Sequence, residues 1–131
     1  MKYLLSILVL FSGLGFTYSY FESIYLVCDE PYTFYPDKSK RWLFQIDETE
    51  VIMYRLSSDN YRLLEFVDDD LKITDSEYYW GGDRIYTWRL DRETLMLNGS
   101  RKCKKVLSYE LDEALIELKD IIDKTKAKRK I

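Results

Sequence analysis

Between residues 21 and 106, apolar and aromatic residues come in short runs separated by polar breaks every eight to twelve residues or so. Within the second run, Trp42, Phe44 and Ile46 alternate with polar side chains, and Leu43 is the exception. Such alternation is expected from strands that bury one face and expose the other. The pattern therefore predicts an antiparallel, mainly β domain.

The breaks between the runs contain the residues that tight reversals require. They lie at 47–50, 57–60, 68–70, 81–83 and 98–99. Glycine and Asn-Gly pairs supply the positive φ angles of two-residue hairpin turns. We predict a small antiparallel meander of about seven or eight strands, forming a barrel or a strongly curled sheet. If the barrel closes, the first strand, SIYLVCDE, meets the last, RKCKKV.

From Ser108 onward, apolar residues recur at intervals of three and four instead of two. The members of this stripe are Leu111, Leu115, Leu118 and Ile122. Ser108 is a predicted N-cap; acidic residues follow it and lysines crowd the opposite end, as the helix dipole favours. We expect one C-terminal amphipathic helix from about Tyr109 to Thr125, within a segment 108–131 that ends in a basic tail.

The N-terminus has the three parts of a secretory signal. Lys2 precedes an apolar run, and small residues lead up to a predicted cleavage site after Ser19. An uncleaved membrane anchor is the alternative, although the apolar stretch of about 14 residues is shorter than the about 20 that a spanning helix needs. The prediction is a signal peptide over 1–19 and a β domain over 20–107, with no membrane span after cleavage and a periplasmic or extracellular location.

The overall charge argues against one class of partner. The chain has a net charge of −3, and removal of a signal peptide that contains Lys2 and no acidic residue would make it −4. An acidic domain of this kind is not expected to bind nucleic acid.

The chain has two cysteines, Cys28 and Cys103, which is the smallest number that can form a disulfide within an exported chain. In an oxidising compartment such a pair is expected to form a disulfide. Closing a loop of about 75 residues would contribute about 4 kcal/mol on the chain-entropy estimate. The alternative is a reactive or metal-binding thiol, but the chain has no histidine to help complete a zinc site. No metal and no cofactor is predicted.

The absence of histidine also removes the usual general base and the usual partner of a serine or cysteine nucleophile. Carboxylate chemistry on glycosidic bonds remains open, but no pair among the 23 acidic residues is distinguished by its surroundings. The acidic triplet 68–70 lacks the spacing of a calcium loop and is predicted to be a solvated hairpin tip. We therefore predict no enzyme activity.

Two features could form a binding surface. Aromatic residues flank the Gly81-Gly82 turn, and adjacent Tyr78 and Tyr79 must face opposite sides of a strand, so one of them is expected on the outer surface. Such rings could stack on a sugar or anchor a protein, or they could simply line the core together with Tyr86, Trp88 and Leu90. The helix stripe could pack on the sheet or dock on a partner. The candidate binding residues are Tyr78, Tyr79, Trp80, Leu115 and Leu118.

The IYLVC segment, the WRLDRETLML segment and the closing RKCKK resemble parts of small exported two-cysteine β proteins of bacteria and their phages. Those proteins have one cysteine in the first strand, an aromatic-x-[LI]-[ND]-R-x-[ST] turn and a second cysteine just beyond it. The turn is matched by Trp88, Leu90, Asp91, Arg92 and Thr94. The resemblance covers the β segment and not the helix, and it implies the fold and the Cys28–Cys103 bridge but no activity.

Together these features predict an exported, non-catalytic binding or protein-interaction module with an unidentified protein or small-ligand partner. A lipocalin-like carrier of a small apolar ligand is the second hypothesis, and a carboxylate hydrolase is the third. Arg92 is the polar residue most strongly expected to have a structural role, by bonding turn carbonyls or an acidic neighbour.

Overall fold

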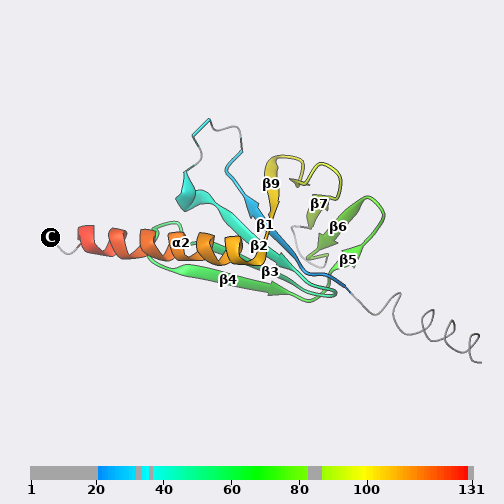
Figure 1. The fold of residues 1–131 in the computed structure, drawn as a ribbon, viewed down its shortest axis with the longest axis horizontal. Coiled ribbons are helices and arrows are strands. Elements are labelled where there is room, and N and C mark those ends of the chain that lie inside the picture. Colours follow the sequence, from blue (N-terminus) through cyan, green and yellow to red (C-terminus); the bar gives the residue numbers. More distant parts are fainter. Residues whose placement is uncertain (1–20, 32–33, 36, 83–86, 130–131) are drawn as a thin grey trace, which may run out of the picture.

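The computed structural model describes residues 21–31, 34–35, 37–82 and 87–129. The predicted signal peptide and Tyr86 lie outside these residues. Over the described chain the protein is a half-barrel made from one antiparallel sheet of nine strands, followed by one long helix (Figure 1). The mainly β class and the C-terminal helix are thus confirmed.

The strands follow one another along the chain with short connections, and a short 3-10 helix, Lys38–Lys40, precedes the second strand. They are β1 Ile24–Cys28, β2 Trp42–Ile46, β3 Val51–Leu56, β4 Leu63–Asp68, β5 Lys72–Ile73, β6 Glu77–Trp80, β7 Trp88–Asp91, β8 Met96–Leu97 and β9 Arg101–Val106. The helix α2 spans Ser108–Arg129.

The sheet order is β4-β3-β2-β1-β9-β8-β7-β6-β5, so the first and last strands are neighbours at the centre of the sheet. The edges of the sheet are β4 and β5, which are consecutive in the sequence. A full barrel would require these two edges to pair. The sheet therefore curls into a half-barrel whose open side lies between β4 and β5, and the meeting of the first and last strands does not close it.

The run LKITDSEYYW divides into two strands instead of the one that was predicted. The hydroxyl of Thr74 accepts hydrogen bonds from the backbone N–H groups of Ser76 and Glu77, at 3.3 and 3.1 Å. These bonds reverse the chain between β5 and β6. The sheet consequently has nine strands, because one polar turn lies inside a run that looked continuous.

The disulfide joins Cys28 to Cys103, and this prediction is confirmed. The two residues are direct cross-strand partners of β1 and β9, with their Cα atoms 4.0 Å apart, and both are buried. The bridge therefore ties together the first four-strand segment and the second five-strand segment at the middle of the sheet.

Strands β1–β3 contribute apolar residues to cores on both of their faces, which explains why their alternation is imperfect. One face joins Leu26, Phe44, Val51 and Met53 to the core inside the half-barrel, and the other packs Leu43 and Leu56 against α2. The helix contributes Leu111, Ala114 and Leu118 to this second core. The face of β2 that was expected to be solvent-exposed is thus covered by the helix, and Leu43 on this face is buried.

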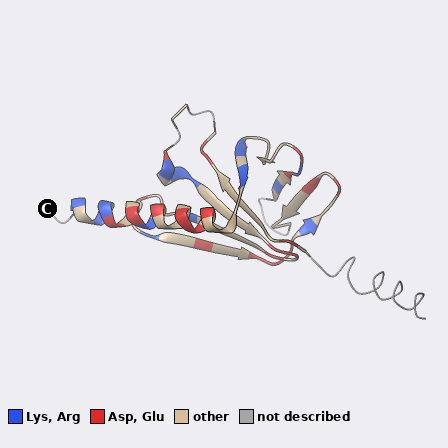
Figure 2. Cartoon of the chain, in the orientation of Figure 1, with Lys and Arg blue, Asp and Glu red and all other residues tan. Residues whose placement is uncertain are grey.

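The helix begins slightly earlier than predicted and extends further, to Arg129. Its N-cap position is occupied by Leu107 and not by Ser108: the carbonyl of Leu107 accepts the N–H groups of Glu110 and Leu111, and its own N–H donates to the Glu110 carboxylate at 2.9 Å. This bond is the glutamate half of a capping box, and the hydroxyl half is absent because the N-cap residue is a leucine. Figure 2 shows acidic residues along the first part of α2 and basic residues near its end.

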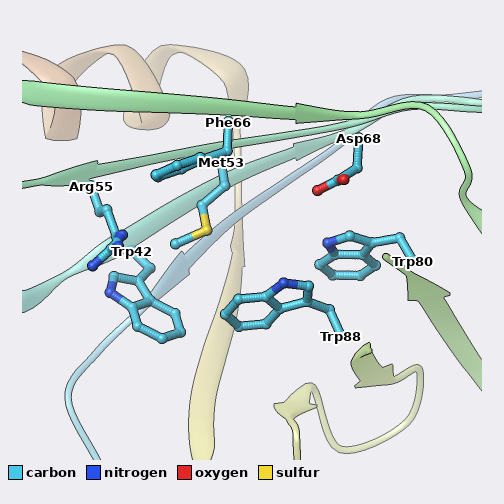
Figure 3. Close-up of a pocket in the computed structure, with 7 residues that line it drawn as sticks. All are labelled: Trp42, Met53, Arg55, Phe66, Asp68, Trp80 and Trp88. Atoms are coloured by element: carbon cyan, nitrogen blue, oxygen red, sulfur yellow. The ribbon is translucent and has the colours of Figure 1, made fainter. Parts of the chain in front are cut away.

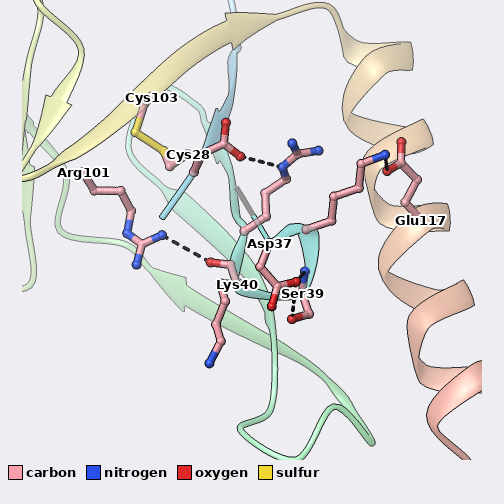
Figure 4. Close-up of polar contacts among 10 residues, drawn as sticks. Cys28, Asp37, Ser39, Lys40, Arg101, Cys103 and Glu117 are labelled. Carbon is pink, nitrogen blue, oxygen red and sulfur yellow. Dashed lines mark hydrogen bonds and ion pairs between the residues drawn. A yellow bond between two sulfur atoms is a disulfide. The ribbon is translucent and has the colours of Figure 1, made fainter. Parts of the chain in front are cut away.

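The 3-10 helix connects the β1–β2 segment to α2. The ammonium group of Lys38 forms an ion pair with Glu117 at 2.9 Å (Figure 4). Asp37 accepts hydrogen bonds from the N–H and hydroxyl of Ser39, and these bonds lower the pKa of the Asp37 carboxyl. The ion pair between Lys38 and Glu117 is thus a polar contact of α2 in addition to the packing of its apolar face.

The triplet 68–70 is not a solvated hairpin tip, contrary to the prediction. It leads from one edge of the sheet to the other, and Asp68 is buried with an exposed fraction of 8%. The Asp70 carboxylate accepts the backbone N–H groups of Gly81 and Gly82 at 3.0 to 3.1 Å. Asp68 therefore lies in the interior, and Asp70 binds the segment between the two edges to the residues that follow β6.

Candidate functional site: an aromatic pocket in the half-barrel

A pocket of about 260 Å³ lies on the concave side of the half-barrel (Figure 3). Its walls come from both sides of the opening: β2, β3 and β4 on one side, and β6 and β7 on the other. The lining residues are Trp42, Met53, Arg55, Phe66, Asp68, Trp80 and Trp88. The register of β3 and β4 brings their lining residues to the same face, because Met53 pairs with Phe66 and Val51 pairs with Asp68.

The three tryptophans of the chain form one aromatic wall. The rings of Trp42 and Trp88 meet edge to face with centroids 5.4 Å apart, and Trp80 is nearly parallel to Trp88 at 6.4 Å. Phe44 lies behind them, 5.8 Å from Trp80. Trp80 is fully buried, whereas Trp42 and Trp88 are half-buried. Such ring pairs are stabilising beyond their buried area, so the wall is pre-formed.

Arg55 is the basic residue of this pocket. It lies on the same face of β3 as Met53, and its guanidinium group is 5.5 Å from the centre of the Phe66 ring. Its Nε atom is buried, and the N–H on it donates to no acceptor in the described part of the chain. In Figure 3 the guanidinium lies beside Trp42, at the end of the pocket away from Asp68 and Trp80. The pocket is therefore polar at both ends and aromatic between them.

A second hollow of about 340 Å³ shares Trp42 and Trp88 with the first. The guanidinium group of Arg101 covers the face of Trp42 there, 3.7 Å from the ring centre, and donates to the carbonyl of Lys40 at 3.2 Å (Figure 4). Burial lowers the pKa of Arg101, and the positive charge of Arg55 acts in the same direction, while Glu30 and Asp29 oppose it. Two positive groups thus lie near Trp42.

The candidate binding residues predicted from the sequence are not brought together. Tyr78 and Trp80 are buried on the inner face, and only Trp80 lines the pocket. Tyr79 faces outward, as the opposite orientation of adjacent residues requires, and the Arg89 guanidinium lies 5.2 Å from its ring. The expectation that Trp88 and Leu90 contribute to the core is met, since Leu90 is a buried member of the core cluster and Trp88 packs against this cluster.

The helix residues Leu115 and Leu118 do not form an accessible docking surface. Leu118 is fully buried between α2 and the sheet, and Leu115 is partly buried against the same cluster. The apolar stripe covers the sheet, and Leu118 has no exposed surface with which to contact a partner. Exposed apolar residues of the helix lie elsewhere, at Tyr109 and Ile116.

Arg92 has the structural role that was expected of it. Its guanidinium donates to the carbonyl of Thr74 in the neighbouring β5–β6 turn at 2.5 Å, and it lies 5.0 Å from the ring of Tyr78. Asp91 accepts the N–H groups of Glu93 and Thr94, which lowers the pKa of the Asp91 carboxyl. The LDRET segment thus forms a structural turn between β7 and β8.

Sequence reasoning missed most of the pocket, namely Trp42, Met53, Arg55, Phe66 and Asp68. One signal was available: Arg55 falls on the opposite face of its strand from Ile52, Tyr54 and Leu56. A charged residue on the face opposite an apolar row is ordinarily expected to be solvent-exposed, but Arg55 lines the aromatic pocket. Alternation assigns a residue to a face and gives no information about the curvature that encloses that face.

Within the described ranges, no group of three or more acidic or cysteine residues is arranged to hold a metal ion. None of the helices in those ranges is both long enough and apolar enough to cross a membrane. The chain matches no protein-family model, and neither a curated protein nor a solved structure is significantly similar to it.

Proposed function

We propose that this protein is an exported, non-catalytic binding module that takes a small ligand into the aromatic pocket of its half-barrel. The observation that carries the proposal is the pre-formed wall of Trp42, Trp80 and Trp88 around an open pocket of about 260 Å³. Pockets with mostly aromatic walls and a few placed polar groups are typical of small-molecule sites. The buried disulfide supports an oxidising compartment and therefore export.

The choice of a binding role over hydrolysis rests on the acids of the pocket. Both common mechanisms of glycoside hydrolysis need two carboxyl groups facing one substrate. Among the described residues that line this pocket, Asp68 is the one acid. A binding role asks for no second carboxylate.

A carrier for a purely apolar ligand fits the pocket less well. Arg55 and Asp68 place charge at both ends, and the volume is at the small end for a drug-sized molecule. The proposed ligand is accordingly small and carries a polar group. A protein-interaction role is less favoured, because Leu118, one of the two helix residues that were to mediate it, is fully buried in the core.

Native mass spectrometry tests this function. The purified chain is incubated with a small-molecule extract of the native host's envelope and medium, and any retained mass is compared between wild type and Trp42→Ala. Tyr109→Ala, at an exposed site on α2, is the matched aromatic control. We expect a small molecule that wild type and Tyr109→Ala retain and Trp42→Ala loses. The absence of any bound molecule, or its equal retention by all three chains, would contradict the proposal.

A further inference from the structure

The guanidinium group of Arg55, which lines the pocket and has a buried Nε atom, indicates which ligand chemistry the pocket favours. Its Nε atom is shielded from solvent, yet its N–H has no acceptor among the described residues. A buried donor without an acceptor is unfavourable, and a donor on a charged group is more unfavourable still. Arg55 also lines the pocket, and the acceptor that a guanidinium group binds most strongly is an anion, because hydrogen bonds between two charged groups are the strongest.

The surroundings of Arg55 reinforce this preference. The guanidinium group of Arg101 lies on the face of Trp42 in the adjoining hollow, and its positive charge repels that of Arg55. Both guanidinium groups keep their positive charge at neutral pH. The Trp42 end of the pocket is consequently a region of positive potential in which an anionic group is stabilised.

The opposite end of the pocket sets the orientation of such a ligand. Asp68 pairs with Val51, four residues along β3 from Arg55, which corresponds to roughly 13 Å of strand. Asp68 already has an interaction within the protein, and a carboxylate in the wall disfavours an anion beside it. A ligand with one negative group is thus directed to place this group at Arg55 and its uncharged part toward Trp80 and Trp88.

The shape and size of the walls favour a flat uncharged part. Trp80 and Trp88 are nearly parallel and present aromatic surface to the pocket, together with the sulfur of Met53 (Figure 3). Aromatic rings pack well against such surfaces in offset or edge-to-face geometry. A volume of about 260 Å³ accommodates one ring with a short side chain and is too small for a long acyl chain.

We propose that the pocket binds a small aromatic monoanion, with its carboxylate on the Arg55 guanidinium and its ring against Trp80 and Trp88. This inference rests on the proposed function and specifies the ligand class of the same site.

The test compares phenylacetate with phenylacetamide, which has almost the same shape and no charge, and with benzylammonium, which has the opposite charge. Chemical-shift titration of the tryptophan indole N–H signals of the full mature chain reports binding at the pocket wall, even for weak ligands. We expect phenylacetate to bind about tenfold or more tightly than phenylacetamide, and benzylammonium to bind least.

Two arginine variants assign the difference to Arg55. Arg55→Met keeps the length and removes the charge, and it should abolish the preference for phenylacetate over phenylacetamide. Arg62→Met removes an exposed arginine from the β3–β4 turn and should retain the preference. The dispersion of the indole signals shows for each variant that the aromatic wall has formed.

Each outcome bears on the inference separately from the function. If phenylacetamide binds as tightly as phenylacetate, or if Arg55→Met keeps the preference, the pocket binds ligands but does not select anions, so the inference fails while the proposed function stands. If none of the three probes shifts the indole signals, the inference is overturned, and the mass spectrometry of host extracts decides the function on its own.

Discussion

Strands β2–β4 have a helix on one face and the aromatic pocket on the other, whereas no helix of the described chain packs behind β5–β8. The first group is held by two apolar cores, one of which contains the fully buried Leu118. The second group is held by one core and by polar turns on its outer side. Its strands are only two to four residues long.

Strands β5–β8 are stabilised at their turns by polar side-chain contacts. Arg89 forms an ion pair with Glu77, Arg92 bonds the carbonyl of Thr74, and Asp91 caps its own turn. Exposed contacts of this kind are worth less than apolar burial and depend more on pH and salt. The comparison indicates that one side of the pocket is supported by apolar packing against the helix, and that the other combines apolar packing on its inner face with exposed polar contacts at its turns.

The disulfide joins these two sides, so its removal should have the largest effect. The bridge closes a sequence separation of 75 residues, and we expect Cys28→Ala/Cys103→Ala to lower the free energy of unfolding by about 4 kcal/mol. Urea unfolding measures this change. Wild type unfolded in reductant is the control that separates the lost cross-link from the smaller side chains. A loss below about 1 kcal/mol in both samples would show that the bridge does not hold the two sides together.

Leu118→Ala should have the next largest effect, and it tests the apolar side alone. Leu118 is fully buried between α2 and the sheet, so its truncation should cost about 3 kcal/mol through lost burial and a cavity. Ile116→Ala, on the same helix with 64% of the residue exposed, is the control and should change stability by less than about 0.5 kcal/mol. Similar losses for both variants in urea unfolding would mean that the helix does not cover the sheet as described.

Asp70→Ala tests the connection between the two edges of the half-barrel. The carboxylate accepts the N–H groups of Gly81 and Gly82, and we expect its loss to cost about 1 to 2 kcal/mol. Asp69→Ala removes the exposed neighbouring acid and should have little effect. Hydrogen exchange at Gly81 and Gly82 provides the second readout, and it should accelerate in Asp70→Ala alone. Unchanged exchange at both glycines would show that the carboxylate does not protect them.

The difference between the two sides also explains how much could be predicted from the sequence. The turns at Asn98 and Gly99 have the positive φ angles that the pair suggested, 51° and 73°, and the two cysteines meet because their strands are neighbours. Strands β5 and β8 have two residues each, which is too short for alternation to define them. The residue types therefore predicted the turn and the pairing of the first and last strands, but they were insufficient to define the two-residue strands.

The pocket could not be predicted for a different reason. Trp42, Arg55, Phe66, Trp80 and Trp88 come from five strands. Their convergence depends on the curvature of the whole sheet and on which faces the helix leaves uncovered. Neither property is encoded in any single run of residues.

Asp91→Asn should have the smallest effect, and it tests whether the polar side weakens first in acid. The N–H groups of Thr94 and Glu93 lower the pKa of the Asp91 carboxyl below 3.8. A carboxyl whose pKa is lowered by folding contributes stability above its unfolded pKa, and this contribution is lost as the pH falls through the folded pKa. Asp91→Asn should therefore reduce stability at neutral pH and make the decline below about pH 4 shallower.

NMR titration of the Asp91 side chain measures its pKa directly, and urea unfolding between pH 7 and pH 2.5 measures the linked stability. Asp75→Asn removes one exposed charge from the same side of the sheet and controls for the change in net charge. An Asp91 pKa at or above 3.8, or parallel stability curves for wild type and Asp91→Asn, would show that this turn carboxylate does not support the side of the pocket that lacks a helix.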